Sequence, residues 1–187
     1  MPFGKGIPSI TIVLCLVLLL SFIPYGQAGD GLSSPHIRHH DLVVTIDPDR
    51  HWLAATDRMV VQVDQSQQPL VFSLAKSLQV IEILLVGQEG TVPLPFSIAS
   101  AQTDSNIQSL SLSLPSHASG DVTVEWRYQG SVDDPPREPR HLRFVTPSET
   151  AGHIGPEGIY LSSESGWYPD LSGSLAAYAL RVEIPDG

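Results

Sequence analysis

The stretch from residue 41 to residue 64, DLVVTIDPDRHWLAATDRMVVQVD, alternates apolar and polar side chains on both sides of a short turn. A period of two gives a strand one apolar and one solvated face, so the stretch predicts two paired antiparallel strands. The turn between them, Asp47-Pro48-Asp49-Arg50, combines a proline that presets φ with aspartates that accept hydrogen bonds from nearby backbone. Such a long hairpin restricts the chain to folds built on antiparallel β-sheet.

Further strand patterns follow, separated by turns rich in glycine, proline and asparagine. They cover residues 69–74, 78–86, 92–98, 107–114, 122–128, 142–145, 159–161 and 178–184. Residues 78–86 are apolar on both faces, which predicts a central strand covered on both sides, whereas two prolines confine residues 92–98 to a sheet edge. Closely spaced strands with polar turns predict an all-β fold, either an antiparallel β-sandwich or a pair of saddle-shaped sheets.

The first 28 residues have the pattern of a helical secretory signal peptide. Lys5 precedes an apolar run from Ile7 to Ile23, and Gly26-Gln27-Ala28 places small residues at a cleavage site. A permanent membrane anchor is the alternative, but the run is short for a bilayer span. We therefore expect residues 29–187 to form one exported domain, periplasmic or extracellular, with no membrane contact after cleavage.

Charge and cysteine content exclude several function classes. The sequence has 10 Lys and Arg against 20 Asp and Glu, a formal net charge of −10. Nucleic acid and anionic lipid both require clustered basic residues, so neither is an expected partner. The single cysteine, Cys15, lies in the predicted signal peptide, so the exported domain would have no disulfide and no thiolate zinc cluster.

No local catalytic motif occurs in the sequence. His-Glu-x-x-His, Gly-x-Ser-x-Gly and a phosphate-binding glycine loop are all absent. Asp133 and Asp134 are adjacent carboxylates, but a glycosidase pair faces across a cleft, so we do not expect catalysis there.

The histidines offer one candidate metal site. The densest group of potential ligands is His36, His39, His40 and Asp41. His39 and Asp41 share a strand face that His40 does not, so a metal-dependent enzyme built on His36, His39 and Asp41 is one hypothesis. The preferred interpretation is a run of solvated histidines that leads into a strand. The other histidines are expected at the surface near turns: His51, His117, His141 and His153.

Two pairs of aromatic residues have different predicted roles. Trp126 and Tyr128 alternate with polar residues and are expected in the core. Trp167 and Tyr168, next to Pro169, are expected to close one end of the sandwich, because large rings bury much area. The alternative is a binding surface for glycan or protein, as in a freestanding exported β-sandwich binding module.

The order of several short elements resembles the N-terminal domain of the M1 family of zinc aminopeptidases. The resemblance covers roughly residues 39–187. Its elements are His40-Asp41-Leu42, Ile46-Asp47-Pro48, residues 58–63, Leu78-Gln79-Val80-Ile81, a strand that ends in Tyr128-Gln129-Gly130, the corner Trp167-Tyr168-Pro169-Asp170, and residues 178–185.

The resemblance implies a non-catalytic N-terminal β domain that packs against and caps a catalytic domain absent from this chain. That catalytic domain, downstream in a metallopeptidase or a non-catalytic relative, would be its partner. Because the family's zinc motif would lie beyond Gly187, the chain looks truncated, and we expect it to carry no catalytic residues, no metal ligands and no cofactor. The family's segment that grips the substrate amino terminus is shortened here to residues 161–166. Glu164 is therefore the one candidate substrate-binding residue.

Overall fold

The computed structural model describes residues 34–64, 69–99, 105–135 and 150–184. These ranges contain twelve strands, β1 to β12, and two 3-10 turns, η1 and η2. They contain no α-helix, which agrees with the all-β prediction, and within them no helix is long and apolar enough to cross a membrane. The predicted signal peptide and the predicted strand at residues 142–145 lie outside the described residues.

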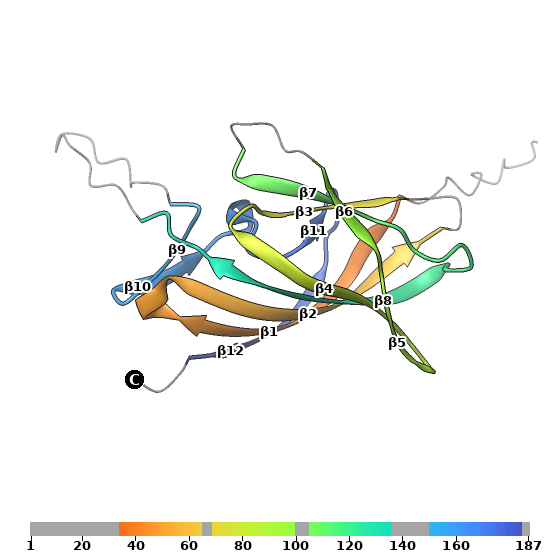
Figure 1. Ribbon diagram of the computed structural model, residues 1–187, viewed down its shortest axis with the longest axis horizontal. Helices are drawn as coiled ribbons and strands as arrows, with labels where there is room; N and C mark the ends of the chain where they lie inside the picture. The colour runs from red at the N-terminus through yellow and green to blue at the C-terminus, as the bar shows by residue number, and fades with distance from the viewer. Residues whose placement is uncertain (1–33, 65–68, 100–104, 136–149, 185–187) are drawn as a thin grey trace, which may run out of the picture. The chain divides into compact units, whose positions relative to one another are not determined.

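The larger sheet has six strands. In spatial order they are β12 (Ala177–Glu183), β1 (His36–Asp47), β2 (Trp52–Val63), β8 (Gly120–Ser131), β4 (Leu78–Gly87) and β5 (Gly90–Pro93) (Figure 1). The predicted hairpin is confirmed, since β1 and β2 pair antiparallel. Its turn is the 3-10 turn η1 (Pro48–Arg50), where the Asp47 carboxylate accepts a hydrogen bond from the Arg50 N–H.

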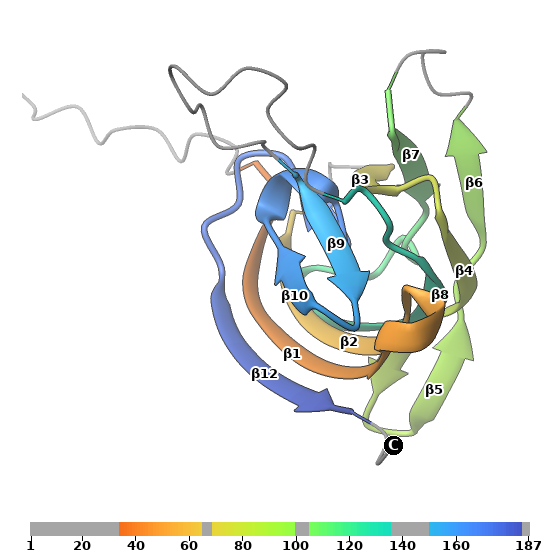
Figure 2. The same cartoon turned by 90° about the vertical axis from the view of Figure 1, so that its left-hand side faces the viewer.

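A four-stranded sheet and a hairpin complete the domain. The four strands, in order, are β11 (Asp170–Leu171), β3 (Leu70–Ala75), β7 (Ile107–Leu112) and β6 (Phe96–Ala99). The hairpin consists of β9 (Gly152–Gly155) and β10 (Gly158–Leu161), and η2 (Ser163–Ser165) follows it. Figure 2 shows β12, β1 and β2 side by side as curved strands, with the hairpin beside η1.

The core lies between the two larger sheets. Alternation along β1, β2 and β8 turns one apolar face of each toward the apolar face of β3 and β7. The predicted core residues Trp126 and Tyr128 are both buried, and the Trp126 ring meets Phe72 of β3 edge to face, with ring centroids 4.9 Å apart. Burial raises the pKa of the Tyr128 hydroxyl well above its ordinary value.

The prediction that residues 78–86 are covered on both sides is wrong. The four-stranded sheet covers only the inner face of the six-stranded sheet, and Ile81 of β4 is 57% exposed, where a bulge shifts the register between Val80 and Glu82. The outer face carries both apolar and charged side chains. There Arg127 forms ion pairs with Glu82 at 2.5 Å and with Glu125 at 2.8 Å.

The two prolines at 93 and 95 divide the strand predicted at residues 92–98 into two. β5 forms one edge of the six-stranded sheet and β6 one edge of the four-stranded sheet. The prediction that this segment lies at an edge is therefore confirmed.

One strand pair departs from the antiparallel prediction. β12 runs parallel to β1, because the chain first crosses to the other sheet, where β11 pairs with β3, and then returns to the end where β1 begins. A parallel pair requires such a crossover connection.

Gly130 explains one element of the sequence resemblance, the Tyr-x-Gly end of β8. A Cβ at this position would lie 2.1 Å from the Ser77 carbonyl oxygen and 2.9 Å from the Leu78 Cα. A glycine inside a strand commonly marks such a close approach of two backbones.

We expect Gly130→Ala to lower the free energy of unfolding by about 1–3 kcal/mol or more, because the start of β4 must move away from β8. The measurement is urea denaturation. Gly87→Ala in β4 is the matched control, since the nearest atom to its Cβ is at 3.6 Å, an ordinary contact. Equal losses in the two variants would contradict this account of Gly130.

Candidate functional site

Strand β12 continues the core face of the six-stranded sheet. Its residues Tyr178, Leu180 and Val182 are the register partners of three β1 residues, His40, Leu42 and Val44. Side chains of partnered residues lie on the same face of a sheet, and the three β1 residues are buried. The apolar side chains of β12 therefore point to the same side as the core.

This part of the core face is not covered by the rest of the described chain. Tyr178, Leu180 and Val182 are 50%, 55% and 47% exposed. Beside them lies an apolar hollow of about 310 Å³, lined by Val44, Ile46, Ile159, Leu161, Trp167, Leu180 and Val182. β12 is also the last strand of its sheet, so one row of its backbone groups has no strand partner in the described ranges. An open apolar face beside an open strand edge is suited to binding another polypeptide.

The aromatic residues Trp167 and Tyr168 lie next to this surface. Trp167 and Tyr168 are half-buried, pack against the core and meet edge to face at 4.9 Å. Tyr168 also contacts the rings of His40 and Tyr178. These contacts favour the predicted aromatic closure over a surface on which sugars stack.

A buried polar pair, His40 and Asp57, lies under Tyr178, the first of the three β12 residues on the core face. The Nδ1–H of His40 donates to Oδ2 of Asp57 at 2.7 Å, and both side chains are 0% exposed. The Tyr178 ring stacks on His40 with centroids 4.8 Å apart and planes 2° apart, and its hydroxyl donates to the Tyr168 oxygen at 3.1 Å. The pair thus joins β1 to β2 and supports the start of β12.

The prediction of solvated histidines is wrong for His40. Its place in the alternation shows why: His40 is in phase with Leu42 and Val44, and Asp57 is in phase with Ala55 and Met59, so both belong to core faces. That phase was the signal in the sequence, and the polar side-chain types concealed it.

Burial dominates the electrostatics of the pair. It raises the pKa of the Asp57 carboxyl, and the hydrogen bond from His40 offsets part of that rise. Nε2 of His40 and Oδ1 of Asp57 have no hydrogen-bond partner. Since a half-satisfied buried pair is costly in free energy, its contribution is to position the strands rather than to stabilise them strongly.

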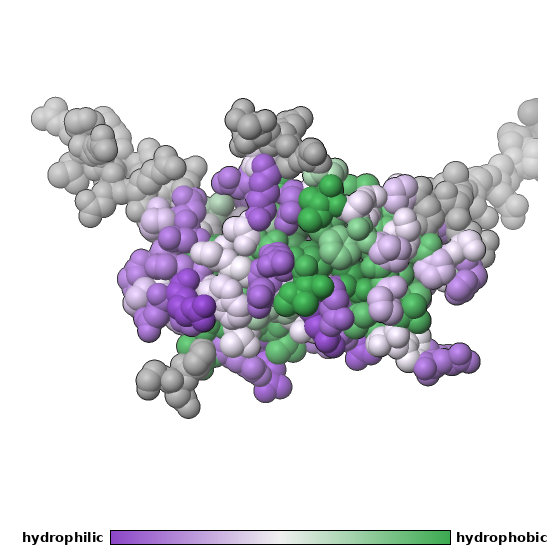
Figure 3. Space-filling view, in the orientation of Figure 1, coloured by the Kyte–Doolittle hydropathy of each residue, from purple (hydrophilic) through white to green (hydrophobic). Residues whose placement is uncertain are grey.

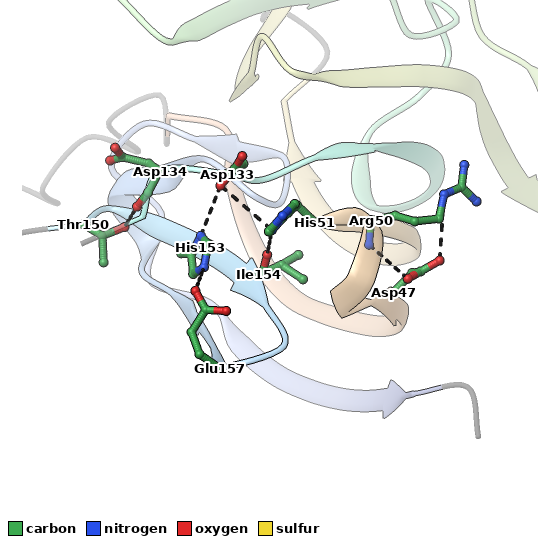
Figure 4. A network of polar contacts seen from close by, with 9 residues as sticks. All are labelled: Asp47, Arg50, His51, Asp133, Asp134, Thr150, His153, Ile154 and Glu157. Carbon is green, nitrogen blue, oxygen red and sulfur yellow. Dashed lines mark hydrogen bonds and ion pairs between the residues drawn. The ribbon is translucent and has the colours of Figure 1, made fainter. Parts of the chain in front are cut away.

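The other predicted ligand residues are not gathered into one site. In the described residues, the group with ligand atoms close enough for a metal ion is His51, Asp133 and His153, not His36, His39 and Asp41. The prediction of a surface position is wrong for His153, which is buried, whereas His51 is partly exposed next to the turn η1. Figure 4 shows both directed at Asp133, with Asp134 directed elsewhere, so the two aspartates do not form a facing pair.

Glu164 lies in η2, exposed at the rim of a second hollow of about 610 Å³. Lys76, Asn106 and Asp133 also line this hollow. The role of Glu164 in substrate binding stays a prediction.

The fold has counterparts among solved structures. A scan against protein-family models finds no match, and a search of the curated proteins finds none either. Native yeast LTA4 hydrolase is similar with a TM-score of 0.55 and 10% sequence identity, over 81% of this chain and 23% of that chain. The M1 zinc metallopeptidase from Deinococcus radiodurans is similar with a TM-score of 0.49 and 18% identity, over 81% and 32%.

The predicted resemblance to the M1 zinc metallopeptidases is confirmed at the level of the fold. The chain spans a third or less of the chains that it matches. That share fits one domain of a larger protein.

We expect Asp57→Ala to lower the free energy of unfolding by about 3–5 kcal/mol, because it leaves the buried imidazole of His40 without a partner. Denaturant unfolding of both single variants and the double variant gives the coupling between the two side chains. The matched control is the exposed pair Arg38–Asp121, which joins β1 to β8 at 2.8 Å and whose coupling we expect to stay below about 1 kcal/mol. Equal coupling energies for the two pairs would contradict the account.

Proposed function

We propose that this chain supplies a non-catalytic N-terminal β domain of an M1-like metallopeptidase, and that it caps the catalytic domain. The likeness to yeast LTA4 hydrolase supports the domain type. The observation that carries the proposal is the open apolar face of β12, whose occupant we take to be that catalytic domain.

The chemistry of the β12 surface supports a protein partner. Its centre is aliphatic and aromatic, while Arg181 and Glu183 form an ion pair at 3.0 Å on the alternate positions of the strand. These two charged residues therefore lie on the opposite face of the sheet. A surface whose centre has no charged side chains is typical of protein interfaces. Exposed apolar surface of this kind is costly to leave in water.

A second exposed apolar region is less suited to this role. Figure 3 shows apolar side chains gathered over β4 and β6. The exposed apolar residues of β4, β5 and β6 include Ile81, Val92 and Ile98. The hollows next to these strands are lined largely by polar and small residues, in contrast to the seven apolar residues beside β12.

Catalysis belongs to the partner in this proposal. Zinc would be bound by the catalytic domain, and this chain would contribute shape and contact surface. The predicted signal peptide supports export, so we place the assembly in the periplasm or outside the cell.

We expect a photo-crosslinking amino acid at position 180 to react with a metallopeptidase catalytic domain in the cells that make this protein. The partner is identified by mass spectrometry as a polypeptide segment from a domain that contains a His-Glu-x-x-His zinc motif or the degenerate remnant of one. The same amino acid at position 98 is the matched control, since Leu180 and Ile98 are 55% and 57% exposed strand residues.

Crosslinks from position 180 to such a domain, and none from position 98, would support the proposal. Crosslinks from position 180 only to a second copy of the chain, or to no protein, would contradict it. So would crosslinks to the catalytic domain from position 98 alone.

A further inference from the structure

His51, Asp133 and His153 come together from three distant parts of the chain (Figure 4). His51 follows η1, Asp133 follows β8, and His153 lies in β9. One ligand atom from each side chain lies within 4.8 Å of the other two. We propose that these three residues bind a divalent transition-metal ion, with Zn²⁺ the best fit, and that Glu157 positions His153 for this role.

The distances are close to those of a tetrahedral zinc site. Nδ1 of His153 lies 3.3 Å from Oδ1 of Asp133, and Nδ1 of His51 lies 3.9 Å from the same oxygen. Zinc bonds of 2.0–2.2 Å place neighbouring ligand atoms about 3.3–3.5 Å apart. Two imidazoles and one carboxylate suit zinc and its first-row neighbours better than Ca²⁺ or Mg²⁺, which prefer oxygen ligands alone.

The contacts of His153 give the strongest argument. Its side chain is buried, its Nε2 lies 2.7 Å from Oε1 of Glu157, and its Nδ1 has no hydrogen-bond partner. When Nε2–H donates to Glu157, the lone pair of Nδ1 faces the Asp133 carboxylate, and two acceptors oppose each other. A cation between Nδ1 of His153 and Oδ1 of Asp133 turns this repulsion into attraction.

Glu157 supplies the support that metal-binding histidines commonly have. Such a histidine usually donates its other ring N–H to a carboxylate or carbonyl, which fixes the tautomer and the ring orientation. Gly155 makes room for the contact, because a Cβ there would lie 2.6 Å from both His153 Nε2 and Glu157 Oε2.

The backbone around the three residues is connected by hydrogen bonds. The Val132 N–H donates to the His51 carbonyl at 2.9 Å, and the Ile154 N–H donates to the Val132 carbonyl at 3.0 Å. His51 itself has φ of 52°, the one non-glycine residue with positive φ in the described ranges. A histidine held in this region is a local strain of the kind found at functional positions.

His51 has a competing contact. Its Nδ1–H donates to the Ile154 carbonyl at 2.5 Å. To bind the ion, the ring must give up this hydrogen bond or turn over to offer Nε2. We therefore expect His51 to contribute less to affinity than His153 or Asp133.

A metal ion here would hold the β9–β10 hairpin against the end of β8. The hairpin forms its own two-stranded sheet, and an isolated bridge between Asp133 and His153 connects it to the segment that follows β8. The sequence has one cysteine, so no intrachain disulfide can fix the hairpin in this position. The role is structural and does not depend on the proposed docking of β12.

The test is titration of the chelator-treated protein with Co²⁺, followed by visible absorption, and with Zn²⁺, followed by calorimetry. We expect one equivalent to bind. Asp133→Asn and His153→Gln should each weaken affinity at least tenfold, Glu157→Gln about 10–100-fold, and His51→Gln by a smaller factor. Zn²⁺ should also slow amide exchange in β9 and leave β6 unchanged.

His39→Gln is the matched control, since His39 is a half-buried histidine outside this group. The His39→Gln variant should bind Co²⁺ and Zn²⁺ as tightly as the unsubstituted protein. Because His153 is buried, its variant can fail to fold, so Asp133→Asn, at an exposed position, decides. The proposal is overturned if no ion binds more tightly than about millimolar, or if Asp133→Asn and Glu157→Gln bind as tightly as the unsubstituted protein.

Discussion

The buried hydrogen bond between His40 and Asp57 is the interaction on which the edge of this domain depends. It joins β1 to β2 and provides the ring on which Tyr178 stacks, so β12 begins at a defined place beside β1. From there the register carries Leu180 and Val182 along the core face, beyond the four-stranded sheet. The open apolar surface is thus a consequence of how a polar pair positions the strands, and the proposed docking function depends on that surface.

Much of this fold follows from the period of two in the sequence. It predicts the β1–β2 hairpin and the inward face of β8. The edge position of residues 92–98 follows instead from their two prolines, which cannot donate a backbone hydrogen bond. The same period places His40 and Asp57 in the core, but a histidine and an aspartate are ordinarily exposed residue types, so the expectation from residue type prevailed over the phase. For β4 the residue types predicted too much burial. Apolar residues on both of its faces suggested a second covering layer, which the described residues do not provide.

Other features depend on contacts that no local pattern encodes. His51, Asp133 and His153 lie far apart in the sequence, and only the pairing of Asp133 with His153 and the left-handed turn at His51 bring their side chains together. The parallel pairing of β12 with β1 likewise depends on the crossing of the chain to β3. The Tyr-x-Gly element was visible in the sequence, whereas its cause, the backbone of Ser77 against Gly130, required the structure.

The central claim is that the inner face of β12 is covered by a metallopeptidase catalytic domain. Hydrogen–deuterium exchange of the isolated 187-residue chain, compared with the native species purified from its own cells, tests it most directly. The account predicts slower exchange of backbone amides in Ala177–Glu183 in the native species, with no change in Phe96–Ala99. Equal exchange of Ala177–Glu183 in the two samples would contradict it.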